Sequence, residues 1–167
     1  MKRKIFFCLL VILMLVTLTA CSKRKENNNS TKNDERTIEY LLDKYIVAYT
    51  NADLELTKEV FPPFYMEYSK DYLTKEKLKE SLNNDIEKLG NDFKVTYDIT
   101  QKEKMTKDEL ETINNKMINQ YKAKEKASEC YKLEGSLIFK GSKGEIIDRL
   151  STIKYCKYDK WYLIRIY

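Results

Sequence analysis

The sequence predicts an α+β fold in which N-terminal helices pack on one face of a curved antiparallel sheet that ends in a three-stranded meander. Three observations support this prediction. Apolar residues recur at helical spacing through 38–89 and again through 107–121. Between these segments, 93–100 alternates between apolar and polar residues, as a half-buried strand does. Residues 131–167 then form three apolar segments joined by short turns, and such neighbours pair antiparallel.

Apolar stripes and helix-stopping residues mark the N-terminal helices. We expect a first helix at 38–49 and a second at 53–61, where Pro62-Pro63 ends it because proline has no amide proton to donate. The aromatic segment 64–72 should add a helical turn or two. The stripe of the first helix consists of Ile38, Leu41, Leu42, Tyr45, Ile46 and Tyr49.

Capping residues locate the next two helices. Thr74 precedes a helix that should end just before Gly90, a residue type common at helix C-termini. Thr106 and Glu109 have the spacing of a capping box at the start of the following helix. The apolar positions of the two helices are Leu78, Leu82, Ile86 and Leu89, then Leu110, Ile113, Met117 and Tyr121.

Turn residues divide the C-terminal part into strands. The first strand carries Tyr131 to Phe139 and ends at the turn Gly141–Gly144. The segment 146–158 returns beside it, and Asp159-Lys160 turns the chain into the last strand, 161–167. These strands complete the predicted meander.

The N-terminus has the layout of an export signal. Lys2, Arg3 and Lys4 precede the apolar run Ile5–Leu18, and small residues follow it. The run is shorter than the roughly 20 residues of a membrane-spanning helix. We therefore expect a signal peptide at 1–20 rather than a permanent transmembrane anchor.

Leu18-Thr19-Ala20-Cys21 resembles the lipobox of bacterial lipoproteins. The resemblance implies that Cys21 receives a diacylglyceryl group and that the chain is cut before it. Two acyl chains hold a protein stably on a membrane, whereas one binds only marginally. The expected location is the extracytoplasmic face of the cell membrane. No cofactor is expected.

Residues 21–36 are expected to form a disordered tether, because Ser22–Arg36 contains no aromatic or aliphatic residue that could be buried. Its Lys23, Arg24 and Lys25 lie beside the lipid, where they either contact anionic headgroups or merely keep the tether soluble. A single domain, 37–167, follows. Its basic and acidic residues are equal in number, which argues against nucleic acid as a partner.

The order of elements in 38–167 and the closing segment Tyr158-Asp159-Lys160-Trp161-Tyr162 resemble the NTF2-like (SnoaL-like, cystatin-like) superfamily, especially its small exported lipoproteins. That family often has glycine in the turn where Lys160 stands. The resemblance implies a cone between helices and sheet that would hold a small apolar ligand. The residues expected to line this pocket are Tyr45, Tyr49, Tyr97 and Trp161.

Catalysis is not indicated by the residues themselves. The sequence has no histidine, the commonest general base and metal ligand. Enzymes of the resembling superfamily often use carboxylates and tyrosines in the cone, and the candidates here would be Tyr45, Tyr49, Tyr97 and Asp98. Asp98, however, falls on the polar side of its strand, and Tyr45 and Tyr49 lie on an apolar stripe. We expect no catalytic residue and no metal site.

Cys130 and Cys156 are the two cysteines of the predicted domain, and they fall on neighbouring strands. If Lys140 pairs with Glu145, a one-residue bulge would place the two cysteines opposite each other. Exported proteins can keep disulfides. The sequence therefore predicts a Cys130–Cys156 bond, and the alternative is a pair of reduced, half-buried thiols.

The function most consistent with these features is a lipid-anchored module without catalytic activity. It would bind a small apolar ligand, an envelope component or a partner protein. An isomerase or hydrolase on the same anchor is one alternative, and a structural domain of an envelope complex is another. A carboxylate facing a tyrosine in a deep cavity would favour the enzyme, whereas an apolar lining would favour the binding module.

Overall fold

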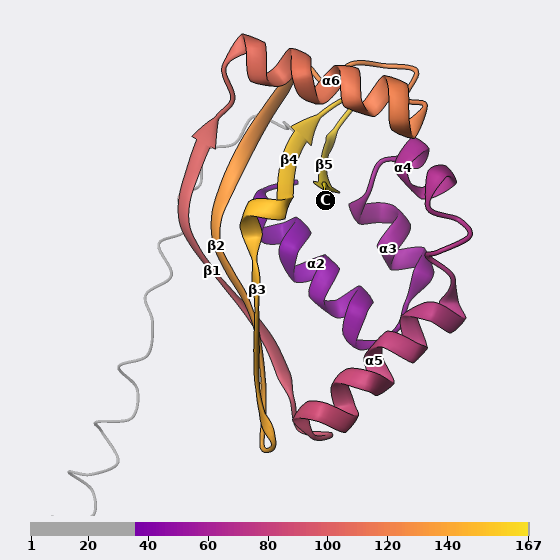
Figure 1. Ribbon diagram of the computed structural model, residues 1–167, viewed down its shortest axis with the longest axis vertical. Coiled ribbons are helices and arrows are strands. Elements are labelled where there is room, and N and C mark those ends of the chain that lie inside the picture. Colours follow the sequence, from indigo (N-terminus) through magenta and orange to yellow (C-terminus); the bar gives the residue numbers. More distant parts are fainter. Residues whose placement is uncertain (1–35, 167) are drawn as a thin grey trace, which may run out of the picture. The chain divides into compact units, whose positions relative to one another are not determined.

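The computed structural model of the chain describes residues 36–166. The expected signal peptide and nearly all of the expected tether, Cys21 included, lie outside the described residues. The described part confirms an α+β fold, with helices packed against a five-stranded antiparallel sheet (Figure 1). Within it, no helix has the length and apolar character needed to cross a membrane.

The helices start and stop close to where their caps predict. Each of four helices begins after a residue whose side chain accepts a backbone amide three positions on; these residues are Thr37, Asp53, Thr74 and Thr106. The capping box at Thr106 and Glu109 is complete. The helices are α2 (Ile38–Thr50), α3 (Leu54–Val60), α4 (Pro63–Tyr68), α5 (Lys75–Leu89) and α6 (Lys107–Tyr121).

One long central strand organises the sheet. Strand β2 pairs with β1 along one side and with β3 and then β4 along the other, while β5 adds to the free side of β4. The strands are β1 (Lys94–Lys104), β2 (Glu129–Gly141), β3 (Gly144–Arg149), β4 (Ile153–Lys157) and β5 (Trp161–Arg165).

The predicted return strand, 146–158, is in fact two strands. A turn of 3-10 helix, Leu150–Thr152, separates β3 from β4. It forms where Leu150 enters the core, fully buried. The interruption shifts the pairing by one residue, so that Lys140 pairs with Glu145 while Cys130 pairs with Cys156. The meander prediction was wrong in this respect, because the shift comes from the 3-10 turn and not from a bulge.

Strand β1 is longer than predicted because it bulges. The pairing with β2 slips between Ile99 and Gln101, and Gln101–Lys104 continues the strand with exposed side chains. Opposite the bulge stands Gly135, with φ of 130°. A Cβ atom there would lie 1.9 Å from the Asp98 carbonyl oxygen, so only glycine fits. Beyond the bulge, β1 no longer alternates between half-buried and exposed residues. The sequence pattern that predicts a strand therefore ended at residue 100.

Two hydrophobic clusters lie on opposite faces of the sheet. Neighbouring residues of β4, Tyr155 and Cys156, belong to different clusters, and so do Leu163 and Ile164 of β5. The interior cluster lies under α2 and α3 and contains Ile38, Leu41, Leu42, Val60, Phe61, Leu133, Leu137, Leu150, Ile153, Tyr155 and Leu163. The disulfide cluster contains Met105, Met117, Tyr121, Ala123, Ala127, Cys130, Cys156 and Ile164.

The second cluster corrects the expectation that all helices cover one face. Helix α6 crosses the end of the sheet near β2 and β4 (Figure 1), and its Met117 and Tyr121 pack in the disulfide cluster. The physical reason is that Cys130, Cys156 and Ile164 would otherwise expose apolar surface on the second face. Both clusters lie within 36–166, so this segment contains the core it needs to fold independently.

Candidate functional site

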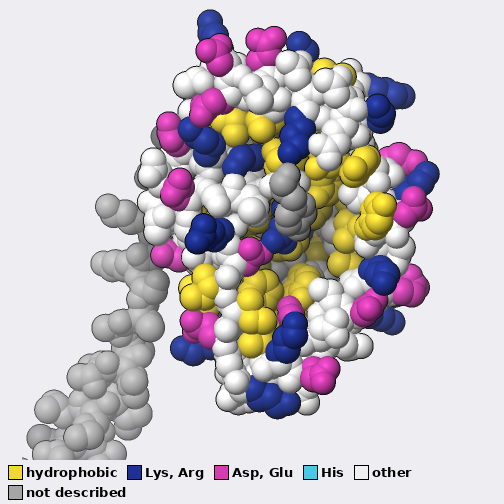
Figure 2. Space-filling model, in the orientation of Figure 1, with side chains coloured by type: hydrophobic (Ala, Val, Ile, Leu, Met, Phe, Trp, Pro, Cys, Tyr) yellow, Lys and Arg dark blue, Asp and Glu magenta, His cyan; other side chains and the backbone are white. Residues whose placement is uncertain are grey.

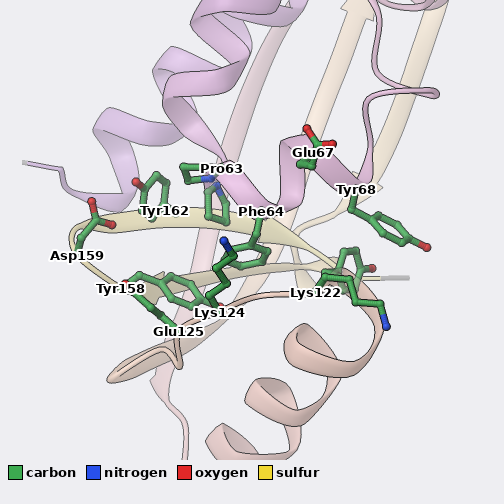
Figure 3. A pocket seen from close by; sticks show the side chains of 12 residues that line it. Pro63, Phe64, Glu67, Tyr68, Lys122, Lys124, Glu125, Tyr158, Asp159 and Tyr162 are labelled. Carbon is green, nitrogen blue, oxygen red and sulfur yellow. The ribbon is translucent and has the colours of Figure 1, made fainter.

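A pocket of about 610 Å³ lies between three separate parts of the domain (Figure 3). These parts are α4, the end of α6 with the loop that follows, and the hairpin between β4 and β5. Figure 2 shows hydrophobic side chains gathered at the surface between α6 and α4. The pocket is lined by Pro62, Pro63, Phe64, Glu67, Tyr68, Tyr121, Lys122, Lys124, Glu125, Tyr158, Asp159 and Tyr162.

Helix α4 forms the first wall because two prolines set its position. Pro62 ends the preceding segment in an extended conformation, and Pro63 occupies the first helical position, where its missing amide proton is not needed. The helix is fastened by Tyr65, whose ring stacks on Phe61 at 5.2 Å and on Tyr121 at 5.5 Å between ring centres. These contacts leave Phe64 facing the pocket.

The second wall is a loop held by a buried asparagine. Asn114, which is 4% exposed, donates to the carbonyl of Ala127 at 3.0 Å and accepts from the amide of Ala127 at 2.7 Å. Lys122 ends α6 in the left-handed conformation, with φ of 58°. Together these features direct the loop past the pocket. Sequence reasoning missed Asn114, although a polar residue beside the apolar stripe of α6 was a signal that could have identified it.

The third wall is the turn of the β4–β5 hairpin. The amide of Tyr158 donates to the carbonyl of Lys160 at 3.0 Å, closing a turn between the paired residues Lys157 and Trp161. The Tyr158 ring meets Phe64 edge-on at 5.2 Å and Tyr162 at 6.4 Å. Rings from α4 and from the hairpin therefore meet across the pocket.

The Tyr158 hydroxyl is buried and has no hydrogen-bond partner within the described part of the chain. Burial raises the pKa of Tyr158 because the phenolate would lose its hydration. This group therefore stays a neutral phenol. A buried hydroxyl without a partner is rare, and here it belongs to a residue that lines the aromatic pocket.

The four tyrosine and tryptophan residues predicted to line a pocket do not line this one. Tyr45 packs edge-on against Phe61 at 5.9 Å, at the border of the interior cluster. Trp161 stacks on Tyr155 with ring centres 4.2 Å apart, on the same cluster. Tyr97 lines a separate pocket of about 430 Å³ beside α2. Tyr45 and Trp161 thus pack against the interior cluster, and Tyr97 lines a pocket between α2 and β1.

Two of the predicted tyrosines contact carboxylates. The Tyr49 hydroxyl donates to Asp85, and burial together with this bond raises the pKa of Tyr49. Burial and then the neighbouring charge of Asp43 raise the pKa of Tyr97 to about 12. Both groups are thus held protonated at neutral pH. Neither pair lines the aromatic pocket.

The remaining predicted residues have simpler surroundings. Asp98 is exposed on β1, as its position on the polar side of the strand predicts. Cys130 and Cys156 are joined by a disulfide and are 1% and 0% exposed. Cys21, the predicted lipid attachment site, lies outside the described residues.

Among residues 36–166, the cysteine and acidic side chains form no group of three or more that could hold a metal ion. The side chains that line the pocket supply aromatic faces, four tyrosine phenols and a charged rim. Comparison with known proteins found no match to any family model, curated protein or solved structure.

Proposed function

We propose that this chain is an exported lipoprotein whose folded part binds a small, largely apolar ligand in the aromatic pocket. The observation that carries the proposal is the pocket itself. Five aromatic rings from three parts of the chain line about 610 Å³, within the range of small-molecule sites. Burying such a ligand against ring faces removes apolar surface from water, which supplies the affinity.

Binding is favoured over catalysis by the placement of the polar groups. The tyrosine–carboxylate contacts, Tyr49 with Asp85 and Tyr97 with Asp43, lie away from the aromatic pocket. Catalysis would need an acid or base within hydrogen-bond reach of the bound molecule. The carboxylates and lysines that line the pocket are solvent-exposed residues, and the Tyr158 hydroxyl is buried and neutral.

We also propose that the fold is NTF2-like. Support comes from helices α2 and α3 packed on a bent sheet, from the long shared strand β2, and from the closing β4–β5 hairpin with Trp161-Tyr162. In this chain the ligand site would lie at the hairpin end of the domain and not beneath α2.

Ligand binding can be tested with N-phenyl-1-naphthylamine, a neutral probe whose fluorescence rises in apolar surroundings. The processed chain from residue 21 with Cys21→Ser should enhance its emission. Phe64→Ala should weaken binding about tenfold, because this ring stands at the centre of the pocket (Figure 3). Val47→Ala, a matched change at an exposed position of α2, should not. Equal binding by both variants would refute the site.

The anchor is tested separately. Cys21→Ser in the full-length chain should accumulate as uncut precursor and incorporate no labelled fatty acid. Normal processing and labelling of this variant would refute the lipoprotein assignment. Cys8→Ser is the matched control. Because Cys8 lies inside the apolar run, this substitution should leave processing unchanged.

A further inference from the structure

We infer that the ligand of the aromatic pocket is an anionic membrane lipid, whose acyl part enters the pocket while its phosphate lies against the cations at the rim. The inference rests on the proposed function and specifies its ligand. It is carried by two observations that are independent of each other. One is where the N-terminal segment joins the domain, and the other is the charge around the pocket.

Arg36 fixes the N-terminal segment beside the pocket. Its Nε donates to the Trp161 carbonyl at 2.8 Å, and its Nη2 donates to the Glu59 carbonyl. Its guanidinium lies 5.1 Å from the ring centre of Tyr162, which lines the pocket. The Tyr155 hydroxyl donates to the Arg36 carbonyl at 2.6 Å. Backbone and side chain of Arg36 are thus both held against β4 and β5.

This attachment point limits how far the pocket can be from the membrane. From Cys21 to Arg36 the chain extends at most about 50 Å, at about 3.5 Å per residue. A domain of this size is about 36 Å across. Because Arg36 lies next to Tyr162, the proposed tether begins close to the pocket, and its length keeps the pocket within reach of the bilayer surface.

The cations around the pocket are not neutralised. Lys124 extends across the pocket beside Phe64 (Figure 3), and the Lys160 ammonium lies 5.5 Å from the ring centre of Tyr162. Within residues 36–166, neither lysine forms an ion pair, and Arg36 is bonded to carbonyls instead of carboxylates. The Lys122 ammonium donates to the Asn119 carbonyl at 2.8 Å and forms no ion pair with any residue of 36–166.

Four carboxylates lie near these cations. Three of them line the pocket, and the fourth, Glu59, lies near Arg36 and Lys160 but is paired with Lys44 at 2.5 Å. Glu67 is already paired with Lys70 at 2.7 Å. Glu125 and Asp159 remain, against Arg36, Lys122, Lys124 and Lys160. Unpaired basic side chains therefore outnumber unpaired carboxylates around the pocket. An anionic head is therefore favoured over a cationic one, and phosphate is the anion that membrane lipids present at this depth.

Tyrosines complete the match to a lipid. Tyr68, which is 44% exposed, stands at the edge of the pocket with its ring 4.6 Å from that of Tyr121. An aromatic ring with a polar tip suits the boundary between acyl chains and headgroups. The pocket thus combines an apolar floor, phenol groups at the boundary and cations outside them, which is the order of groups along a phospholipid.

Two short-chain lipids that differ only in the headgroup test the inference. Isothermal titration of the processed Cys21→Ser chain would compare dihexanoyl-phosphatidylglycerol with dihexanoyl-phosphatidylcholine, both kept monomeric. We expect the anionic lipid to bind at least about fivefold tighter, and 0.5 M NaCl should reduce the difference because salt screens exposed charges. Equal affinities, or no binding of either lipid, would overturn the inference.

Matched variants locate the effect. Lys124→Met should weaken binding of the anionic lipid about three- to fivefold and leave the affinity for the zwitterionic lipid unchanged. Lys94→Met, a similar exposed lysine on β1, should change neither. If Lys94→Met has the same effect as Lys124→Met, only general charge is involved and the inference fails. Binding of the neutral naphthylamine probe without any lipid preference would refute the lipid inference while leaving the proposed function intact.

Discussion

Two aromatic regions of this domain are built from similar residues and differ in what covers them. In the interior cluster, Tyr155 and Trp161 stack with ring centres 4.2 Å apart beneath the helix-covered face. In the pocket, Phe64 and Tyr158 meet edge-on at 5.2 Å and leave space beside them. The same class of side chain thus fills one region and only lines the other.

The covering helix accounts for the difference. Helix α2 spans 13 residues and presents several fully buried side chains to the sheet, including Leu41 and Leu42. Helix α4 has six residues, begins at the second of two prolines, and has no buried residue. A helix this short cannot bury enough surface to close over the hairpin end. We conclude that the length of the covering element, more than composition, decides whether an aromatic region becomes core or pocket.

The largest effect should come from the filled region. Leu133→Ala removes a side chain that is 1% exposed in the interior cluster, and the cavity it leaves should lower the free energy of unfolding by about 4 kcal/mol. Ile147→Ala, at a position that is 60% exposed on β3, should cost less than about 0.5 kcal/mol. Urea unfolding of the processed chain measures both. Similar costs would mean that the interior is not tightly packed.

The disulfide cluster should rank second. Reducing the bond between Cys130 and Cys156 opens a loop with a sequence separation of 26, and the freed chain entropy should cost about 3 kcal/mol. Urea midpoints with and without reductant would show the difference. The Cys130→Ala, Cys156→Ala double variant should match the reduced protein and be insensitive to reductant. Alkylation of both cysteines in unreduced protein would contradict the bond.

A smaller effect is expected at the start of α6, the helix that leads into the pocket wall. Thr106→Ala removes the cap and should cost about 1 kcal/mol. Glu109 accepts hydrogen bonds from Lys132 and from the Thr106 amide, and these lower its pKa from 4.5 to about 2.

The lowered pKa sets the sign of a pH dependence. Because Glu109 binds its proton less readily in the folded state, its carboxylate stabilises the fold above about pH 4.5, and this contribution disappears as the pH falls towards 2. Glu109→Gln should therefore lose less stability than the wild type over that interval. Thermal unfolding at pH 6, 4 and 2.5 would test this, and parallel curves would contradict it.

The smallest expected change in the free energy of unfolding comes from removing single tyrosine hydroxyls, and it should differ between Tyr49 and Tyr158. Tyr49→Phe removes a hydroxyl that donates to Asp85 and should cost about 1 kcal/mol. Tyr158→Phe removes a hydroxyl with no partner in residues 36–166, so the change should be close to zero or slightly stabilising. Urea unfolding of the two variants provides the comparison. A marked loss in Tyr158→Phe would show that the hydroxyl has a partner, such as an ordered water.

Local features were predictable because their causes are local. The helix caps at Thr74 and Thr106 and the end of α5 at Gly90 depend on residues within a few positions, and the structure has them where the sequence predicts. The pairing of Cys130 with Cys156 required two long-range assumptions. The pairing of Lys140 with Glu145 is present, whereas the one-residue shift comes from the 3-10 turn and not from the assumed bulge.

Features that depend on distant residues were not predictable. The break between β3 and β4 follows from Leu150 entering a core built by other segments. The placement of α6 on the second face follows from the disulfide cluster, which neighbouring residues of β4 and β5 reach from opposite sides. Alternation identifies a strand with one buried face, but it does not show that a second face is also covered at one end.

By itself, the sequence determined the α+β class, the helix boundaries and the tyrosine-rich character of the folded part. The place where the aromatic rings leave space was decided only by the tertiary structure. Phe64, Tyr121 and Tyr158 come from three distant segments, and the volume between them depends on how far α4, α6 and the hairpin approach one another. Periodicity reports which side of an element is apolar, whereas a pocket is a property of the gap between elements.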